Sequence, residues 1–353
     1  MQLFEQAITL IDRKQSFALA IVVRAAGSTP QKAGAKALFE RDGAVHGTLG
    51  GGCLEAEARR RAMDALDTGK PVVFDLKLDD DYGWDDGLIC GGNVRVFIEP
   101  RPERHRATLA GAGSAPLAER GAFLLQIAPG VGATSGWVLA SEYESLCAQS
   151  GSTSLRAALS ATEPAWFEEK NAQGDAVGEM YIEPIEPPAS LLIAGGGHVG
   201  QAVARLGSWL GFRVTVIDDR ALFTEAGRYP SGVRTICGDI PKEVGAFPID
   251  NSTFILIATR GHRHDGVVLK ECIRSPAAYI GMIGSKRKAL TIRKGLIEEG
   301  AAVESDFGRV RSPVGLAIGA RSVEEIAVSI ISEIIAVRRA SDASPRTMSI
   351  YAV

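Results

Sequence analysis

The stretch LLIAGGGHVGQAVARL, residues 191–206, indicates how the second half of the chain folds. In it, an apolar run is followed by Gly195, Gly197 and Gly200 in the spacing G-x-G-x-x-G, and a helical pattern begins directly after them. The first glycine permits a tight turn, the second lets the backbone approach a pyrophosphate, and the third allows close packing of helix on strand. Because the start of a helix presents free N–H groups to an anion, the stretch predicts a nucleotide-binding loop.

The acidic end of the next apolar run supports this interpretation. FRVTVIDDR, residues 212–220, contains Asp218 and Asp219 about 20 residues after the glycines, where a carboxylate binds the ribose hydroxyls of a dinucleotide. An acidic strand end disfavours the additional phosphate of NADP, so NAD is the expected ligand. His198, inside the glycine loop, is a candidate phosphate donor, acid or base. Two alternatives stay open: a Rossmann-like sheet without a nucleotide, and a histidine that only caps the helix.

The rest of the second half continues in short apolar runs, each separated by enough residues for a helix. These runs are VRTICGD (233–239), TFILIAT (253–259) and YIGMIGS (279–285). The alternation predicts an α/β fold with a doubly wound parallel sheet. RSVEEIAVSIISEIIAVRRA, residues 321–340, predicts a long final helix with Ser322 and Glu325 as its capping box.

Two polar clusters follow later strands of this half. ATRGHRHDG contains His262, His264 and Asp265, residue types that bind metals. The chain offers no clear further ligand at motif spacing, so we expect no metal site and interpret these histidines as solvated or phosphate-facing. YIGMIGSKRK ends in a polar turn in which Ser285 and Lys286 suit an anionic group. A solvated helix start is the alternative.

The first half of the chain is dominated by strand-like runs, with few and unevenly placed helices. This pattern predicts an α+β domain with a mixed or antiparallel sheet. The stretch EPIEPPAS, residues 183–190, contains prolines that can neither donate to a ladder nor continue a helix. We therefore expect an N-terminal α+β domain over residues 1–186 and a Rossmann-like nucleotide-binding domain over residues 187–353.

A glycine run and a thiol form the principal motif of the first half. In TLGGGCLEAEARRRAMDAL, Gly50, Gly51 and Gly52 run into Cys53, and a helical composition begins there. Backbone N–H groups of such a turn can reach an anion, and a thiol in the first helical turn lies at the positive end of the helix dipole. A thiolate there is a nucleophile or a ligand for a soft metal.

A second thiol beside paired glycines, Cys90, occurs in LICGGNV. For each cysteine alone, the alternative is a small buried hydrophobic side chain next to a tight turn. Two Cys–Gly junctions together favour a site at which Cys53 and Cys90 act. GSTPQKAGAKA adds another glycine turn, with Ser28, Thr29 and Lys36 as donors to an anion. The remaining cysteines lack such a setting and are expected in the core: Cys147, Cys237 and Cys272.

Composition excludes several classes of protein. The 353 residues carry a formal net charge of -3 with interspersed signs, so nucleic-acid binding is not expected. No apolar run approaches the roughly 20 residues of a membrane-spanning helix, and no signal peptide is visible, which makes the cytoplasm the expected location. The 5 cysteines are an odd number without a CxxC pair, which indicates reduced thiols and no structural zinc.

These motifs, in their order along the chain, resemble the XdhC/CoxI family of xanthine dehydrogenase accessory proteins. The resemblance rests on GSTP, GAKA, GTLGGGCLE and CGGNVRVFIEP in the first half, and on LLIAGGGHVGQAVA, DDR, YIGMIGSKRK and SPVGLAIGARSVEEIAVSII in the second. It covers nearly all of the chain except residues 101–185. At Arg260 the chain departs from the family pattern, which has a histidine after the threonine.

The resemblance implies a two-domain, homodimeric protein that binds molybdenum cofactor (molybdopterin). Such a protein protects the sulfurated cofactor and delivers it to a molybdenum hydroxylase such as xanthine dehydrogenase, while a cysteine desulfurase performs the sulfuration. It is an accessory chaperone more than a turnover enzyme. Two rival hypotheses are an NAD-dependent oxidoreductase that uses a thiol, and an interaction scaffold with a vestigial nucleotide fold.

Overall fold

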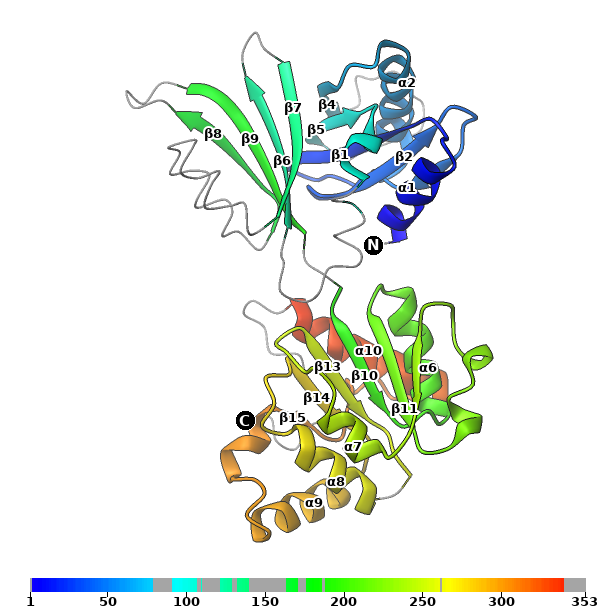
Figure 1. The fold of residues 1–353 in the computed structure, drawn as a ribbon. Helices are drawn as coiled ribbons and strands as arrows, with labels where there is room; N and C mark the ends of the chain where they lie inside the picture. Colours follow the sequence, from blue (N-terminus) through cyan, green and yellow to red (C-terminus); the bar gives the residue numbers. More distant parts are fainter. Residues whose placement is uncertain are drawn as a thin grey trace. The chain divides into compact units, whose positions relative to one another are not determined.

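The chain divides into two compact units, residues 1–187 and residues 188–353 (Figure 1). The computed structural model describes residues 2–78, 91–106, 109, 121–128, 132–139, 163–170, 176–185, 188–260 and 262–339. Among these residues, no helix has both the length and the apolar character needed to cross a bilayer.

Unit 1 contains an antiparallel sheet in the order β3-β2-β1-β5-β4. Its strands are β1 (Phe17–Ala26), β2 (Lys36–Glu40), β3 (Val45–Gly47), β4 (Val72–Leu78) and β5 (Gly92–Glu99). The central strand β1 is apolar along most of its length because both of its faces are covered. Helix α2 (Gly52–Thr68) packs on one face through small residues such as Ala58 and Ala62, and α1 (Gln2–Asp12) packs on the other.

A second antiparallel sheet of unit 1 has the order β7-β6-β9-β8. Its strands are β6 (Gly121–Ala128), β7 (Gly132–Leu139), β8 (Ala165–Lys170) and β9 (Ala176–Ile185). This sheet shares a core with the α1 side of the first sheet, where the ring centroids of Phe97 and Phe123 are 6.0 Å apart and Phe123 also contacts Tyr181. The short 3-10 helix η2 (Pro102–His105) follows β5.

Unit 2 is built on a parallel sheet in the order β12-β11-β10-β13-β14-β15. Its strands are β10 (Ser190–Ala194), β11 (Arg213–Asp218), β12 (Arg234–Cys237), β13 (Thr253–Ile257), β14 (Tyr279–Met282) and β15 (Val310–Arg311). The strand order reverses at β10, which lies between β11 and β13. This is the switch point at which open α/β sheets bind their ligands.

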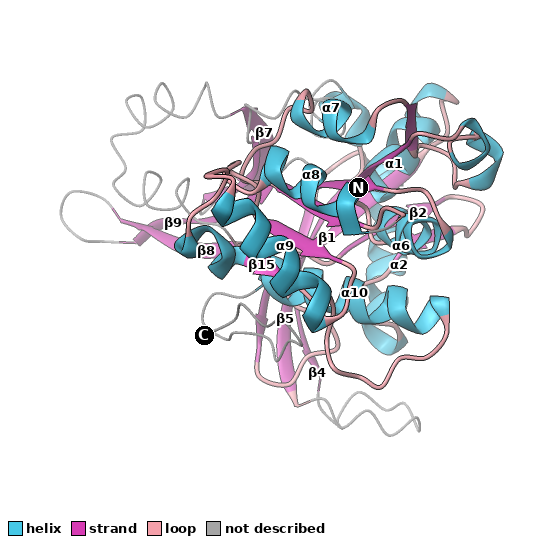
Figure 2. Ribbon diagram, turned by 90° about the horizontal axis from the view of Figure 1, so that it is seen from below, coloured by secondary structure: helices cyan, strands magenta, loops and turns pink. Residues whose placement is uncertain are grey.

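Helices cover both faces of the parallel sheet. One face carries α6 (His198–Trp209) and α10 (Val323–Arg339), which pack on each other, and the other carries α7 (Ile240–Gly245), α8 (His262–Cys272) and α9 (Lys286–Glu298). Figure 2 shows α7, α8 and α9 in a row. Short 3-10 helices lie after β11, namely η4 (Ala221–Phe223) and η5 (Ala226–Arg228), and before β15, η6 (Glu304–Arg309). The predicted fold class, a doubly wound parallel sheet preceded by an α+β region, is confirmed.

The predicted capping box of the last helix is also confirmed. Glu325 N–H donates to Ser322 Oγ at 3.2 Å, and Ser322 N–H donates to Glu325 Oε2 at 3.0 Å. Two backbone N–H groups at the start of α10 are thereby satisfied.

Candidate functional site

Glycine turns from separate parts of unit 1 pack together at one end of its first sheet. The turn after β1 lies directly on the start of β5, because a Cβ added to Gly92 would be 2.5 Å from the carbonyl oxygen of Ser28. The same turn lies on the glycine run before α2, because a Cβ at Gly50 would be 2.6 Å from Cβ of Pro30. At both positions any larger residue would force the backbones apart.

Two further glycines of these turns face open space. Gly51 (φ 77°) and Gly91 (φ 56°) have left-handed backbones, and a Cβ at either would meet no atom of the described residues within 4 Å. A glycine is therefore needed at each position for its backbone conformation, and not because neighbouring atoms would clash with a side chain. The turns that carry GSTP, GGGC and the glycines of CGGN thus form one surface, which no described residue covers at Gly51 and Gly91.

The N-terminus of α2 lies in this surface and has no side-chain cap. Gly51 is the N-cap residue and offers no side chain to the first-turn N–H groups. Glu55, which lies in that turn, is used elsewhere: it accepts hydrogen bonds from Thr48 Oγ1 at 2.6 Å and from Leu49 N–H at 2.9 Å. This arrangement fixes the glycine run and leaves the positive end of a 17-residue helix for an anion.

Cys53 is half-buried at this helix start and packs at the edge of the apolar cluster between α2 and the sheet. Its partner in the sequence prediction, Cys90, lies outside the described residues, as does Cys147. Cys272 is buried, as expected for a core residue. The same expectation is wrong for Cys237, which is exposed because β12 is the edge strand of its sheet.

Two of the polar residues of GSTPQKAGAKA bond within unit 1. Lys36 forms an ion pair with Glu183 of β9 and donates to the carbonyl oxygen of Gly34 at 2.8 Å. Thr29 Oγ1 donates to the carbonyl oxygen of Gln31 at 2.9 Å. Lys36 therefore ties the two sheets together, a role that the local sequence could not reveal.

The glycine loop of unit 2 has the geometry that its spacing predicts. A Cβ at Gly195 would lie 2.3 Å from the carbonyl oxygen of Ala258, and one at Gly200 would lie 2.0 Å from that of Gly195. Gly197 differs, since a Cβ there would meet nothing within 4 Å. His198 is exposed as the first residue of α6, which has no side-chain cap. The open side of the loop therefore lies at Gly197 and His198.

Asp218 has its hydrogen-bonding capacity filled by the protein. The residue is 1% exposed, and its carboxylate accepts from Gly196 N–H at 2.8 Å, from Arg220 N–H at 3.0 Å, and from Nε and Nη2 of Arg220 at 2.8 and 3.0 Å. Burial raises the pKa of Asp218, but these hydrogen bonds outweigh burial and hold its pKa below the ordinary value. The binding of a ribose by Asp218 stays a prediction, and Arg220 is a residue that motif spacing did not single out.

The polar turn after β14 leads into α9, and Lys288 of that helix bonds to the turn and forms an ion pair with a residue of α8. Ser285 caps α9 by accepting from Lys288 N–H at 3.3 Å, and Lys286 is exposed. Lys288 pairs with Asp265, one of the residues considered for a metal, while His264 is exposed. Within the part of the chain that the structure describes, no group of three or more His, Cys, Asp or Glu side chains could hold a metal ion.

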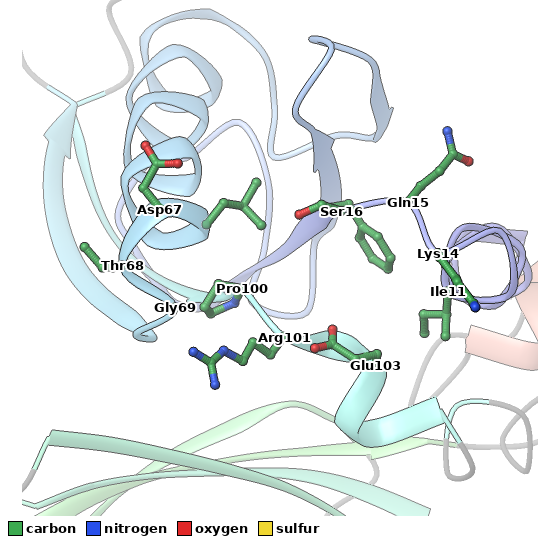
Figure 3. Close-up of a pocket in the computed structure, with 12 residues that line it drawn as sticks. Ile11, Lys14, Gln15, Ser16, Asp67, Thr68, Gly69, Pro100, Arg101 and Glu103 are labelled. Carbon is green, nitrogen blue, oxygen red and sulfur yellow. The ribbon is translucent and has the colours of Figure 1, made fainter.

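A cavity of about 480 Å³ lies at the opposite end of α2 from Cys53 (Figure 3). Its lining comes from the C-terminal ends of α1 and α2, the start of β1 and the segment after β5. Arg101 places its guanidinium at Gly69, the C-cap residue of α2, and Glu103 also lines the cavity. Because three separate segments of the chain form this cavity, no sequence motif indicated it.

The fold and these sites define a class of protein: a Rossmann-like unit with a glycine loop, joined to an α+β unit whose glycine turns surround a helix start and a thiol. The sequence pattern of the XdhC Rossmann domain matches residues 191–334, and that of the XdhC and CoxI family matches residues 10–77. The chain belongs to the XdhC and CoxI family.

Several known proteins are similar over most of the chain. A probable xanthine dehydrogenase subunit of Bacillus subtilis is 26% identical, over 94% of this chain and 96% of that protein. The molybdenum cofactor insertion chaperone PaoD of Escherichia coli is 24% identical, over 91% of this chain and 83% of PaoD. The uncharacterized protein YqeB of Escherichia coli is 25% identical over 96% of this chain, which spans 46% of YqeB.

A crystal structure described as a xanthine dehydrogenase from Bacillus halodurans has the same fold. It superposes with a TM-score of 0.74 at 24% identity, covering 97% of this chain and 98% of that one. At this identity the match supports the fold alone.

Proposed function

We propose that this protein is a molybdenum cofactor insertion chaperone for a molybdenum hydroxylase such as xanthine dehydrogenase, and that it holds the cofactor during and after sulfuration. The names of two relatives, a probable xanthine dehydrogenase subunit and a molybdenum cofactor insertion chaperone, support this role. The observation that carries the proposal is the meeting of the glycine turns around the uncapped start of α2, where Cys53 is half-buried.

The residues present fit such a ligand. Molybdenum cofactor is an anionic pterin phosphate whose dithiolene holds a soft, thiophilic metal, and the cofactor is quickly lost in water. The N–H groups at Gly52 and Cys53 would bind an anionic group at the positive end of α2. The open faces of Gly51 and Gly91 leave room for a ring system against the backbone. Cys53 supplies a sulfur of the kind that soft metals prefer, and Cys90 is proposed as its companion.

The wider role follows from the same proposal. A cysteine desulfurase would perform the sulfuration, and the chaperone would act as a cytoplasmic homodimer that transfers cofactor without turning over a substrate. In unit 2, the glycine loop with His198, together with Ser285 and Lys286, would hold a second anionic group of a nucleotide or pterin. The rival hypothesis of an NAD-dependent oxidoreductase draws no support from Asp218, whose acceptor positions are occupied.

Cofactor content tests the proposal. The full-length protein is purified from a host that makes molybdenum cofactor, and bound molybdenum and pterin are measured per chain. We expect close to stoichiometric amounts of both, and transfer that activates an apo molybdenum hydroxylase. Cys53→Ala should lower the bound molybdenum because a soft ligand is lost.

Cys237→Ala is the matched control, since Cys237 is exposed on an edge strand of unit 2. It should keep the cofactor content of the unmodified protein. Absence of molybdenum and pterin from the unmodified protein, with no transfer, rejects the chaperone role. Equal cofactor content in the two cysteine variants rejects the role of Cys53.

A further inference from the structure

At the carboxyl end of β11, the group available to a ligand is the guanidinium of Arg220. In a dinucleotide site for NAD, the corresponding group is a carboxylate. An ionised carboxylate has about four acceptor positions. At Asp218 these are taken by Gly196 N–H and by three donors of Arg220. A ribose diol, which needs a free acceptor, therefore has none at Asp218.

Arg220 is held firmly in this position. Its Cζ lies 3.6 Å from the ring centroid of Phe223, while the side chain remains 28% exposed. Arg228 lies over the same ring at 5.1 Å and bonds to Gln201 of α6. A guanidinium stacked on an aromatic ring and paired with a carboxylate loses little freedom when it binds a further anion.

The second acidic residue of this strand end is neutralised as well. Arg260, after β13, donates from Nη2 to both carboxylate oxygens of Asp219, at 2.9 and 3.1 Å. Arg228 pairs with no carboxylate within the described ranges. The side chains of Asp218, Asp219, Arg220, Arg228 and Arg260 therefore sum to one positive charge, at a strand end that the bare sequence marked as acidic.

We propose that the glycine loop of unit 2 and the end of β11 bind a nucleotide of the NADP type, with the ribose 2′-phosphate held by Arg220 and Arg228. In a Rossmann-like unit the pyrophosphate lies at the glycine loop and the adenosine ribose at the end of the second strand, here Gly195–Gly197 and β11. An arginine beside that ribose accommodates a 2′-phosphate. This inference reverses the NAD preference that the acidic pair suggested, and it stands independently of molybdenum cofactor binding in unit 1.

Calorimetry on the full-length protein tests the inference with two small probes, adenosine 2′,5′-bisphosphate and adenosine 5′-monophosphate. The bisphosphate should bind roughly 10-fold or more tightly than the monophosphate, and NADP should bind more tightly than NAD by a similar factor. Arg220→Gln should remove most of this preference and leave the weak binding of the monophosphate unchanged. Arg220→Lys, which keeps the charge but not the planar donor pair, should retain part of it.

Arg205→Gln is the matched control, because Arg205 is an exposed arginine of α6 in the same unit. It should bind both probes as the unmodified protein does. Thermal unfolding verifies that each variant is folded, and Arg220→Lys keeps the test valid if Arg220→Gln is unstable. Equal binding of the two probes, tighter binding of NAD, absence of binding at millimolar concentration, or a preference that survives Arg220→Gln would each overturn the inference. An unchanged molybdenum content in Arg220→Gln separates this result from that of the chaperone proposal.

Discussion

The ammonium group of Lys288, in the first turn of α9, forms an ion pair with the carboxylate of Asp265, which lies in α8 and is 0% exposed. The same carboxylate accepts a hydrogen bond from Thr259 N–H at 3.1 Å and another from the Thr259 hydroxyl. Lys288 also donates to the carbonyl oxygen of Ile283 at 3.1 Å. The pair thus joins the segments that follow β13 and β14, at the carboxyl-terminal edge of the sheet.

Removal of Lys288 should be strongly destabilising. Lys288→Met leaves a buried carboxylate without its counter-charge, which costs about 3–5 kcal/mol of unfolding free energy. Denaturant unfolding measures the change. Lys286→Met is the control, because Lys286 is exposed and should change stability by no more than about 0.5 kcal/mol. Adding Asp265→Asn to Lys288→Met should recover part of the loss, and a loss equal to that of the control would contradict a structural role for the pair.

Gly197→Ala should separate folding from nucleotide binding. The new Cβ meets nothing within 4 Å, and the φ of -61° suits any residue, so the unfolding free energy should change little. Because the Cβ projects into the open side of the loop, it should lower nucleotide affinity, measured by calorimetry, by about tenfold or more. Gly200→Ala is the contrasting variant: its Cβ would lie 2.0 Å from the carbonyl oxygen of Gly195, so it should lose stability as well. Unchanged affinity in a folded Gly197→Ala would show that no phosphate binds at this loop.

Thiol reactivity should follow exposure in the folded protein. Burial raises the pKa of the Cys272 thiol to about 12, so it stays protonated and protected at neutral pH. Among the three cysteines that the structure describes, iodoacetamide followed by peptide mass spectrometry should therefore label exposed Cys237 first, half-buried Cys53 more slowly, and Cys272 only after unfolding. When bound cofactor is present, labelling of Cys53 should slow further while that of Cys237 stays the same. Equal slowing of both would indicate a general change in stability, not a ligand at Cys53.

The sequence predicts those features of this protein that depend on neighbouring residues, and misses those that depend on distant ones. The glycine loop of unit 2, its parallel sheet and the Ser322–Glu325 cap follow from local spacing. Glu183, the partner of Lys36, is 147 residues away, so no pattern in the residues near Lys36 indicates that it joins two sheets. Arg220 is only two residues from Asp218, yet whether the two side chains bond to each other depends on how the chain turns after β11.

Acid should lower the unfolding free energy of the protein through Glu57 of α2. The side chain of Glu57 is 16% exposed and accepts hydrogen bonds from Arg60 and Arg61. The bonds from Arg60, followed by those from Arg61, outweigh burial and lower the pKa of Glu57 to about 2. Its pKa in the unfolded chain is about 4.3. The folded state therefore binds this proton less readily, so the stabilisation is complete above about pH 4.3 and is lost as the pH falls towards 2.

Glu57→Gln removes this contribution at every pH. Since Arg60 is 60% exposed and screened by solvent, the variant should lose only about 1 kcal/mol at pH 7. The difference between the two proteins, measured by denaturant unfolding from pH 7 to pH 2, should shrink through the window between the two pKa values and vanish at its acid end. Asp64→Asn is the control, because Asp64 pairs with the same arginine but is 66% exposed. A difference that stays constant with pH would mean that Glu57 stabilises α2 by packing, since only the loss of its charge changes across that window.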